Sequence, residues 1–513
     1  MNKMDVLDTI IATWPWALTT AVVTYYSGLG VYRLFLHPLA RFPGPKLAAV
    51  SRWYEAYYDV IKDGQFTFKI KELHKKYGPI IRISPFELHV LDPDFYPEIH
   101  RQDGVWDKYA WAVDAFVAPG ATMFTPSHSI HRARRLPLNP FFSRAKISSS
   151  STQELLSRHI EKLIYQISRH ISEKGGQINI GAALNALTRD IANDFIIERD
   201  CDSLSREGFD FEASMNPGPI WRLTKHLRWF NRALRTLPSS IFQRVAGDGM
   251  RAFYRHLGET LVALQHLTAK AKEDPNASSE NNIVQAILSS KLPDSDKTFE
   301  RTFEELSTIM GAGIETTAGV LRMVLFHSYT NPTILSQLRT ELAALPSSTT
   351  DEDLSLKALE KLPYLTAVLT EGLRLSPAVA TRMSVIAPDR DLFYGNLRIP
   401  PGTPVGMTTL LMQTDEDVFP DPLRFDPERW LEDGELAKTV PNAFAPFGKG
   451  TRICVGMHLA WAELYLVTAT LVRDFDFDFA GTTAEDLRAI SDQFIIGTKH
   501  GGNLNAVASV RRD

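Results

Sequence analysis

The side chains with the clearest capacity for chemistry surround Cys454, one of only two cysteines in the chain. It lies in the stretch FGKGTRICVG, together with Phe447, Gly450, Arg452 and Gly456. A buried thiolate that binds iron needs backbone N–H donors, because an uncompensated buried charge is costly. Glycines let the backbone approach a flat macrocycle, and an arginine can hold the acidic edge of such a ring. The pattern indicates a thiolate ligand for an iron macrocycle, with a structural free cysteine as the alternative.

A second group of polar residues interrupts an apolar helix that the sequence predicts over residues 302–332. Gly311 and Gly313 each cost about 1 kcal/mol relative to alanine in a helix interior. Glu315 and Thr316 follow them directly. A carboxyl group next to a hydroxyl group can hold water and pass protons in a dry site. This helix is therefore expected to cross the whole domain and to carry function at its middle.

A pair of opposite charges lies in the otherwise apolar stretch PYLTAVLTEGLRLSP. Glu371 and Arg374 are three residues apart, so they share one face of a helix. On a surface the pair would contribute under ~1 kcal/mol. The apolar surroundings instead predict burial, where each charge requires its partner.

Together these motifs resemble the haem-ligand signature of the cytochrome P450 family, which the loop around Cys454 matches at every defining position. The resemblance implies haem b (iron protoporphyrin IX), with the Cys454 thiolate as its axial ligand. It implies that Glu315 and Thr316 deliver protons during oxygen chemistry. It adds Arg429 to Glu371 and Arg374 as a structural triad, and it implies propionate contacts at His131, Arg135 and Arg382. The common family pattern has tryptophan where His131 stands.

The activity implied by the resemblance is monooxygenation of a lipophilic small molecule with O2. No G-x-G-x-x-G fingerprint opens a βαβ unit, so electrons must come from another protein. The expected donor is NADPH–cytochrome P450 reductase, with cytochrome b5 as an additional partner. The basic residues expected to receive the reductase are Arg132, Arg134, Lys438 and Lys449. The alternatives are a haem-thiolate isomerase or dehydratase, against which Glu315–Thr316 argues, and a non-catalytic haem or lipid carrier.

The segments that line the pocket in this family are apolar in this chain. They are residues 106–124, 377–381 and 493–497, and such a lining suits a lipophilic substrate. The opening of the body resembles membrane-bound monooxygenases of filamentous fungi, a group that includes trichodiene oxygenase and relatives in secondary-metabolite pathways. On that resemblance a terpenoid is the first expectation, and a polyketide or an indole-type alkaloid is the alternative. The segment 217–234 mixes tryptophan with basic residues and is expected either to touch a membrane or to pack as an ordinary helix.

The elements that must position these residues are mainly helices. Amphipathic periodicity predicts helices over 151–171 and 250–273. Alternation between prolines predicts short strands within 77–93, and residues 392–405 read as a hairpin. Thr302 and Glu305 form a predicted capping box. The fold class is therefore mainly α with small β-sheets, the cytochrome P450 fold, preceded by one N-terminal transmembrane helix.

The N-terminus is expected to anchor the chain. Residues 9–32 hold no charged side chain, and about 20 residues suffice to span a bilayer as a helix. We therefore divide the chain into an anchor (1–36), a proline-rich hinge (37–46) and a haem-thiolate domain (47–513). Basic residues after the span place the domain in the cytosol, as for a single-pass protein of the endoplasmic reticulum membrane. A cleaved signal peptide is the alternative.

Composition narrows the class of protein further. The formal net charge of -4 and the pI near 6.4 give no basic excess for binding nucleic acid. Two cysteines cannot form a disulfide framework, so a reducing compartment is expected. Cys201 lies in ERDCDSL without the glycines and arginine that surround Cys454, and we interpret it as structural.

Overall fold

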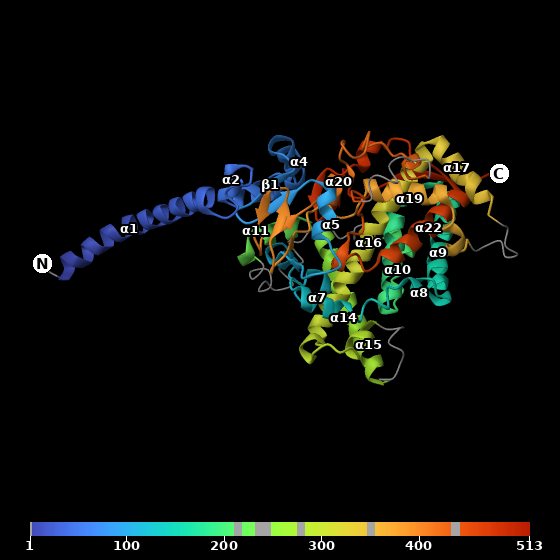
Figure 1. Cartoon of the computed structure of the whole chain (residues 1–513). Helices are drawn as coiled ribbons and strands as arrows, with labels where there is room; N and C mark the ends of the chain where they lie inside the picture. Colours follow the sequence, from blue (N-terminus) through green and yellow to red (C-terminus); the bar gives the residue numbers. More distant parts are fainter. Residues whose placement is uncertain are drawn as a thin grey trace.

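The computed structural model describes residues 3–209, 218–230, 248–273, 283–345, 354–431 and 442–512. This part of the chain is mainly helical, as predicted (Figure 1). Its helices are α1 (Lys3–Val31), α2 (Lys46–Val50), α3 (Trp53–Ala56), α4 (Phe66–Tyr77), α5 (Tyr96–Ile99), α6 (Ala110–Val113), α7 (His128–Arg135), α8 (Arg144–Ile147), α9 (Ser150–Lys174), α10 (Ile180–Ile197), α11 (Gly218–His226), α14 (Asp248–Glu273), α15 (Ile283–Leu288), α16 (Phe299–Thr330), α17 (Pro332–Ala343), α18 (Leu356–Leu359), α19 (Pro363–Leu375), α20 (Thr409–Gln413) and α22 (Met457–Asp474).

Small sheets complete the fold. The strands are β1 (Ile80–Arg82), β2 (Leu88–Val90), β3 (Asp107–Lys108), β4 (Gln177–Asn179), β5 (Val385–Ile386), β6 (Leu392–Tyr394), β7 (Leu397–Ile399), β8 (Val405–Gly406), β9 (Phe475–Asp478), β10 (Ser491–Gln493), β11 (Ile495–Gly497) and β12 (Asn505–Val510). A five-stranded sheet has the order β1-β2-β8-β5-β3, in which only β2 and β8 pair in parallel. A three-stranded sheet has the order β4-β12-β9. The predicted hairpin is β6–β7, with Phe393 opposite Arg398.

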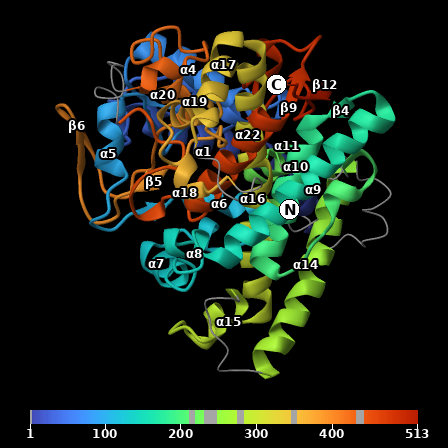
Figure 2. The same cartoon turned by 90° about the vertical axis from the view of Figure 1, so that its right-hand side faces the viewer.

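The long helix α16 runs through the middle of the body and packs against α10, α19 and α22 (Figure 2). It begins one turn earlier than predicted. Thr298 is its N-cap, and its side chain accepts the Arg301 N–H at 3.2 Å. The predicted capping box is therefore wrong: Thr302 lies inside the helix, and the buried Glu305 side chain instead accepts the Thr122 hydroxyl at 2.6 Å. The hydrogen bond between Glu305 and Thr122 thus links the start of α16 to the segment that precedes α7.

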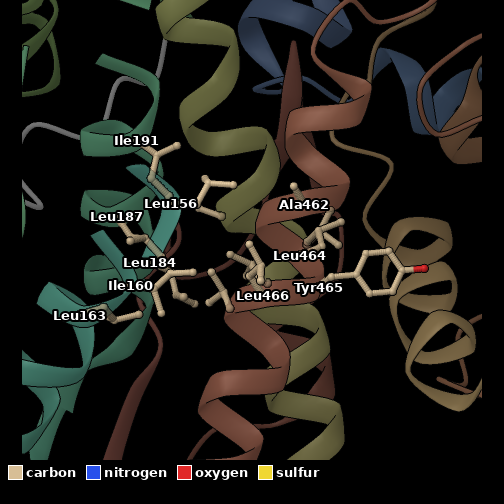
Figure 3. Packing of buried hydrophobic residues seen from close by; sticks show 14 of the residues in the cluster. Leu156, Ile160, Leu163, Leu184, Leu187, Ile191, Ala462, Leu464, Tyr465 and Leu466 are labelled. Carbon is tan, nitrogen blue, oxygen red and sulfur yellow. The ribbon is translucent and has the colours of Figure 1, made fainter. Parts of the chain in front are cut away.

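The main core lies where α9, α10 and α22 meet around α16 (Figure 3). Leu156 and Ile160 of α9 and Leu187 of α10 pack in the same buried cluster as Leu464 of α22. Gly313 of α16 serves this packing: a Cβ added there would lie 3.3 Å from the Ala192 Cβ on α10. Gly313 therefore faces a neighbouring helix, and its lack of a side chain allows the close approach of α10.

The N-terminal helix α1 extends away from the body (Figure 1), and its side chains at Trp14 and Trp16 are exposed. Within the described residues, the one helix that meets the length and hydropathy expected of a membrane span is α16, which lies in the core. The predicted hinge is not helical between residues 37 and 45, and it docks on the body through buried Leu39 and Phe42.

Candidate haem-thiolate site

The loop that carries Cys454 is built to present its sulfur. The Cys454 N–H donates to the Phe447 carbonyl at 2.9 Å, and the Gly456 and Met457 N–H groups donate to the sulfur. Gly450 has φ +74°, and a Cβ there would lie 2.5 Å from the His100 carbonyl oxygen. Only glycine fits this close approach. The loop then leads into α22 at Met457, whose positive end also favours a thiolate.

The thiol of Cys454 combines surface accessibility with a shifted pKa. Its side chain is accessible, yet burial raises its pKa, against the lowering effect of the two N–H groups and Arg135. Ala312 is likewise exposed in the middle of α16, between largely buried turns. The cysteine and this position of the central helix are thus accessible, although the residues around them are largely buried.

Basic side chains gather beside the cysteine loop with too little negative charge to balance them. Burial and the nearby charges of Arg452 and Arg135 lower the pKa of Lys108 to about 7. Burial and the same cationic neighbours lower the pKa of His131 well below its usual range. The Arg452 Nε is buried without a hydrogen-bond partner. An anion placed among these groups would relieve their repulsion, and the two propionates of haem have that charge.

The arginines of this group also hold the loop itself. Arg135 Nη1 donates to the Ile453 carbonyl at 2.7 Å, and Arg452 donates to the Thr125 and Pro126 carbonyls at 2.9 and 2.7 Å. The structure thus brings together His131, Arg135 and Arg452, as predicted. Sequence reasoning missed Lys108, whose only signal was an isolated lysine in the aromatic stretch WDKYAWAV.

Arg382 does not join this group, and its prediction as a propionate contact is corrected. Its guanidinium is buried and donates to Glu87 at 2.9 and 3.0 Å and to Glu55 at 2.8 Å. These two carboxylates raise the pKa of Arg382 and already neutralise it. A spacing of eight residues after Arg374 could not reveal acidic partners from distant parts of the chain.

The predicted triad of Glu371, Arg374 and Arg429 is present. Arg374 makes two bonds of 2.7 Å to the carboxylate of Glu371, and Arg429 Nε lies 3.5 Å from the same carboxylate. The Trp430 indole N–H also donates to Glu371 at 2.9 Å. All three triad members are buried, so the predicted burial is confirmed.

Glu315 and Thr316 lie next to one another on α16 but differ in their partners. The Thr316 hydroxyl donates to the Ala312 carbonyl at 2.7 Å, which ties it to the exposed position on the helix. The Glu315 carboxylate instead binds Arg322 and Asn185. Both residues line a cavity that is partly open to solvent. A threonine and an acid that line such a cavity can together carry protons inward.

The segments predicted to line a pocket converge. Phe116 stacks on Phe124 with ring centroids 4.1 Å apart, and it lies 4.6 Å from the Phe494 ring. Trp221 of α11 packs on both Phe116 and Phe494, at 5.7 Å from each. Val379 packs against the same cluster. Phe116, Phe124, Trp221 and Phe494 thus form one aromatic cluster, here called the aromatic wall, and Val379 from the third predicted segment packs against it.

The predicted basic docking patch is only partly present. Arg132 is exposed, but Arg134 pairs with Asp296 at 2.6 Å and is mostly buried. Arg134 is therefore corrected from a docking residue to a structural one. Lys449 is half-buried, and Lys438 lies outside the described residues. Cys201 is buried, and burial raises its pKa to about 11, in keeping with a structural thiol.

Comparison with known proteins agrees with this geometry. The model of the family described as cytochrome P450 matches residues 53–501. Tryptophan 6-hydroxylase fscE of Fusarium equiseti is 39% identical over 474 residues, which cover 91% of each chain. N-acetyltryptophan 6-hydroxylase ivoC of Emericella nidulans is 34% identical and covers 96% of this chain and 97% of its own. Conidiogenone synthase PchP450 of Penicillium rubens is also 34% identical, over 95% of this chain and 97% of its own.

These matches cover nearly the whole chain, and the relatives are fungal monooxygenases of secondary metabolism. Family members hold haem through a cysteine thiolate, which is the role that the loop around Cys454 can perform. The chain therefore belongs to the cytochrome P450 family and is a monooxygenase.

Proposed function

We propose that this monooxygenase hydroxylates a lipophilic secondary metabolite that carries an aromatic ring, with an indole as the first class to test. The observation that carries the proposal is the aromatic wall of Phe116, Phe124, Trp221 and Phe494. Aromatic side chains favour offset or edge-on contact with another ring. Two of the relatives are named as hydroxylases of tryptophan or N-acetyltryptophan, which supports the same substrate class.

A terpenoid, the first expectation from the sequence, is the second candidate. The residues of the wall and those packed against it are apolar in the described part of the chain, which also suits a hydrocarbon skeleton. Detection of one added oxygen, either on an indole or on a terpene, distinguishes the two substrate classes. Polyketides stay a third class for the same assay.

In the proposed mechanism the protein positions groups around a haem that supplies the oxygen-activating chemistry. Cys454, with the N–H groups of Gly456 and Met457, would hold the iron, and Lys108, His131, Arg135 and Arg452 would hold the propionates. Thr316 would hold a proton at its hydroxyl next to the cavity, and Glu315 would pass protons from the same cavity, which is partly open to solvent. The aromatic wall would exclude water and orient the substrate.

We also propose a membrane location and an external electron source. The surface of α1 and of the nearby body exposes large apolar and aromatic side chains, which include Trp14, Trp16, Phe35, Leu36, Leu47, Trp53 and Ile61. Such a surface next to basic Arg33 and Arg41 suits a single-pass anchor in the endoplasmic reticulum membrane, with the domain in the cytosol. Electrons would come from NADPH through cytochrome P450 reductase, with cytochrome b5 as a further partner.

The test is co-expression of the full chain with a reductase in yeast microsomes, followed by feeding of N-acetyltryptophan, tryptophan and a panel of terpenes. The proposal expects NADPH- and O2-dependent gain of one oxygen on an indole substrate. Turnover of terpenes alone would favour the second candidate. Conversion without NADPH or O2 would instead identify an isomerase or a dehydratase.

A further inference from the structure

Helix α11 buries two cations within nine residues. Arg222 and Lys225 are each only 3% exposed. A buried charge costs several kcal/mol unless a partner of opposite charge compensates it. Arg222 donates to the Asp492 carbonyl at 2.9 Å and contacts Asp63 and Gln493. Lys225 has a different set of partners, and they lie on the N-terminal side of the body.

The ammonium of Lys225 occupies the centre of a buried acidic group. Its Nζ lies 2.7 Å from Glu55 Oε1 and 2.7 Å from Asp59 Oδ2. His226 Nε2 contacts the same Asp59 oxygen at 3.0 Å. The ligand-type atoms of Glu55, Asp59 and His226 lie within 4.8 Å of one another, a spacing that would also suit a metal ion. Here the lysine supplies the positive charge, and it thereby fastens α11 to α3 and to the π-helical turn that holds Asp59.

The same group reaches the segment that precedes β5. Glu55 also accepts a bond from Arg382 at 2.8 Å, and Arg382 pairs with Glu87 at 2.9 Å. Arg382 directly follows residues 377–381, one of the segments predicted to line the pocket. Helix α11 and the segment 377–381 are therefore both linked to one buried carboxylate, that of Glu55.

Lys225 also touches the aromatic wall directly. Its Nζ lies 4.7 Å from the ring centroid of Trp221 and 5.4 Å from that of Trp111. A cation at this distance from an indole face is attracted to it, and the attraction is stronger when the site is desolvated. The hydroxyl of Thr224, the residue before Lys225, donates to the Ala115 carbonyl at 2.8 Å, next to Phe116. The charge that neutralises Glu55 and Asp59 is thus the charge that holds Trp221.

We propose that Lys225 is a positioning residue for substrate selection. Fixed by Glu55 and Asp59, it holds Trp221 against Phe116 and Phe494 and so sets the width of the pocket. The inference rests on the proposed function, because it assigns the aromatic wall to the substrate pocket. It predicts that loss of the lysine charge changes which ligands fit, beyond any change in stability.

The experiment uses full-length haem-loaded protein and two nitrogen ligands of haem iron, imidazole and 4-phenylimidazole. The dissociation constant of imidazole reports on the haem iron alone, whereas the phenyl group of 4-phenylimidazole must also enter the pocket. In Lys225→Met we expect the dissociation constant of 4-phenylimidazole, from spectral titration, to change by about tenfold. The dissociation constant for imidazole should stay within about twofold of its value in the unaltered protein. Lys225→Arg should restore part of the difference.

The matched control is Lys270→Met, which removes a lysine paired with Glu198 at the surface; both constants should match those of the unaltered protein. Equal changes for both ligands in Lys225→Met, or none, would overturn the proposal. If Lys225→Met fails to fold, Trp221→Leu tests the same wall, and an unchanged preference between the ligands would overturn the proposal. An unaltered protein that binds neither ligand would refute the haem site itself, and the inference with it.

Discussion

Glu371 and Arg374 form a two-bonded ion pair that is completely buried, with Nε–Oε2 and Nη2–Oε1 both at 2.7 Å. The pair connects to the cysteine loop. Arg374 Nη1 donates to the Gln413 carbonyl at 2.8 Å, and the Gln413 side chain accepts the Ala445 N–H at 3.0 Å. Ala445 stands two residues before Phe447, so the ion pair supports the loop through two hydrogen bonds.

Glu371→Gln should therefore destabilise the protein and release haem. Removal of one charge leaves Arg374 buried and unpaired, at a cost of about 3–5 kcal/mol. We expect a lower unfolding temperature and a smaller carbon monoxide difference band per milligram of purified protein. Glu360→Gln, which removes a carboxylate paired with Arg144 at the surface, should change both values little. Full haem content in Glu371→Gln would contradict the supporting role.

Cys454→Ser should abolish the thiolate spectrum and product formation while the body stays folded. Serine cannot supply the sulfur that the Gly456 and Met457 N–H groups stabilise. Difference spectra with carbon monoxide and product assays measure the two effects. Cys201→Ala, a change at the other cysteine, should keep both the thiolate spectrum and product formation. The role assigned to Cys454 is wrong if its serine variant retains the spectrum and the activity.

Thr316→Ala should separate electron consumption from product formation. Without the hydroxyl that would hold a proton at the site, proton delivery would be less selective, so we expect product per NADPH to fall roughly 10- to 100-fold. NADPH oxidation and peroxide release are measured beside product. Thr330→Ala removes the same kind of bond, from Thr330 to the Phe326 carbonyl at 2.7 Å, at the end of the same helix. Equal losses in both variants would indicate a helix effect and exclude the proton role.

Two buried histidines should make stability depend on pH. His74 Nδ1 bonds the Gly78 carbonyl at 2.8 Å, His74 Nε2 bonds His89 Nδ1 at 2.7 Å, and His89 Nε2 bonds the Thr408 hydroxyl at 2.9 Å. Two neutral rings satisfy this chain of bonds: His74 donates to the Gly78 carbonyl, His89 Nδ1 donates to His74 Nε2, and the Thr408 hydroxyl donates to His89 Nε2. Burial lowers the pKa of His74 to about 4. Burial, His74 and Arg382 also lower the pKa of His89.

In the unfolded chain these histidines take up protons near pH 6.5. Between about pH 6.5 and pH 4 the unfolded state binds more protons, so the stability is full above this window and is lost as the pH falls through it. The slope reaches up to about 1.4 kcal/mol per pH unit for each ring. Across this pH range, the unfolding temperature of His89→Gln should depend less steeply on pH than that of the unaltered protein. Replacement of the exposed His266 by Gln should leave the slope unchanged, and an equal slope in all three proteins would refute the assignment.

The sequence was most informative where function requires closely spaced residues. The loop around Cys454 and the helical pair Glu371–Arg374 could be predicted because their partners are local or follow the family pattern. Lys108 and Arg382 could not be assigned correctly, because the charged groups that surround them come from distant parts of the chain. These groups are Arg135 and Arg452 for Lys108, and Glu55 and Glu87 for Arg382. The capping box Thr302–Glu305 is wrong because the Glu305 side chain binds Thr122, far away in the chain, while Thr298 caps the helix one turn earlier. Gly313 serves helix packing, which no single-sequence pattern reveals.

The close fit of Gly450 against the carbonyls of His100 and Arg101 has a consequence for how the protein is made. The segment that contains His100 and Arg101 leaves the ribosome long before the loop around Cys454 is synthesised. The iron-binding loop can acquire its native form only after nearly the whole chain has been translated. Cofactor capture is therefore a late event in biogenesis, and nascent chains stalled before residue 450 should remain colourless.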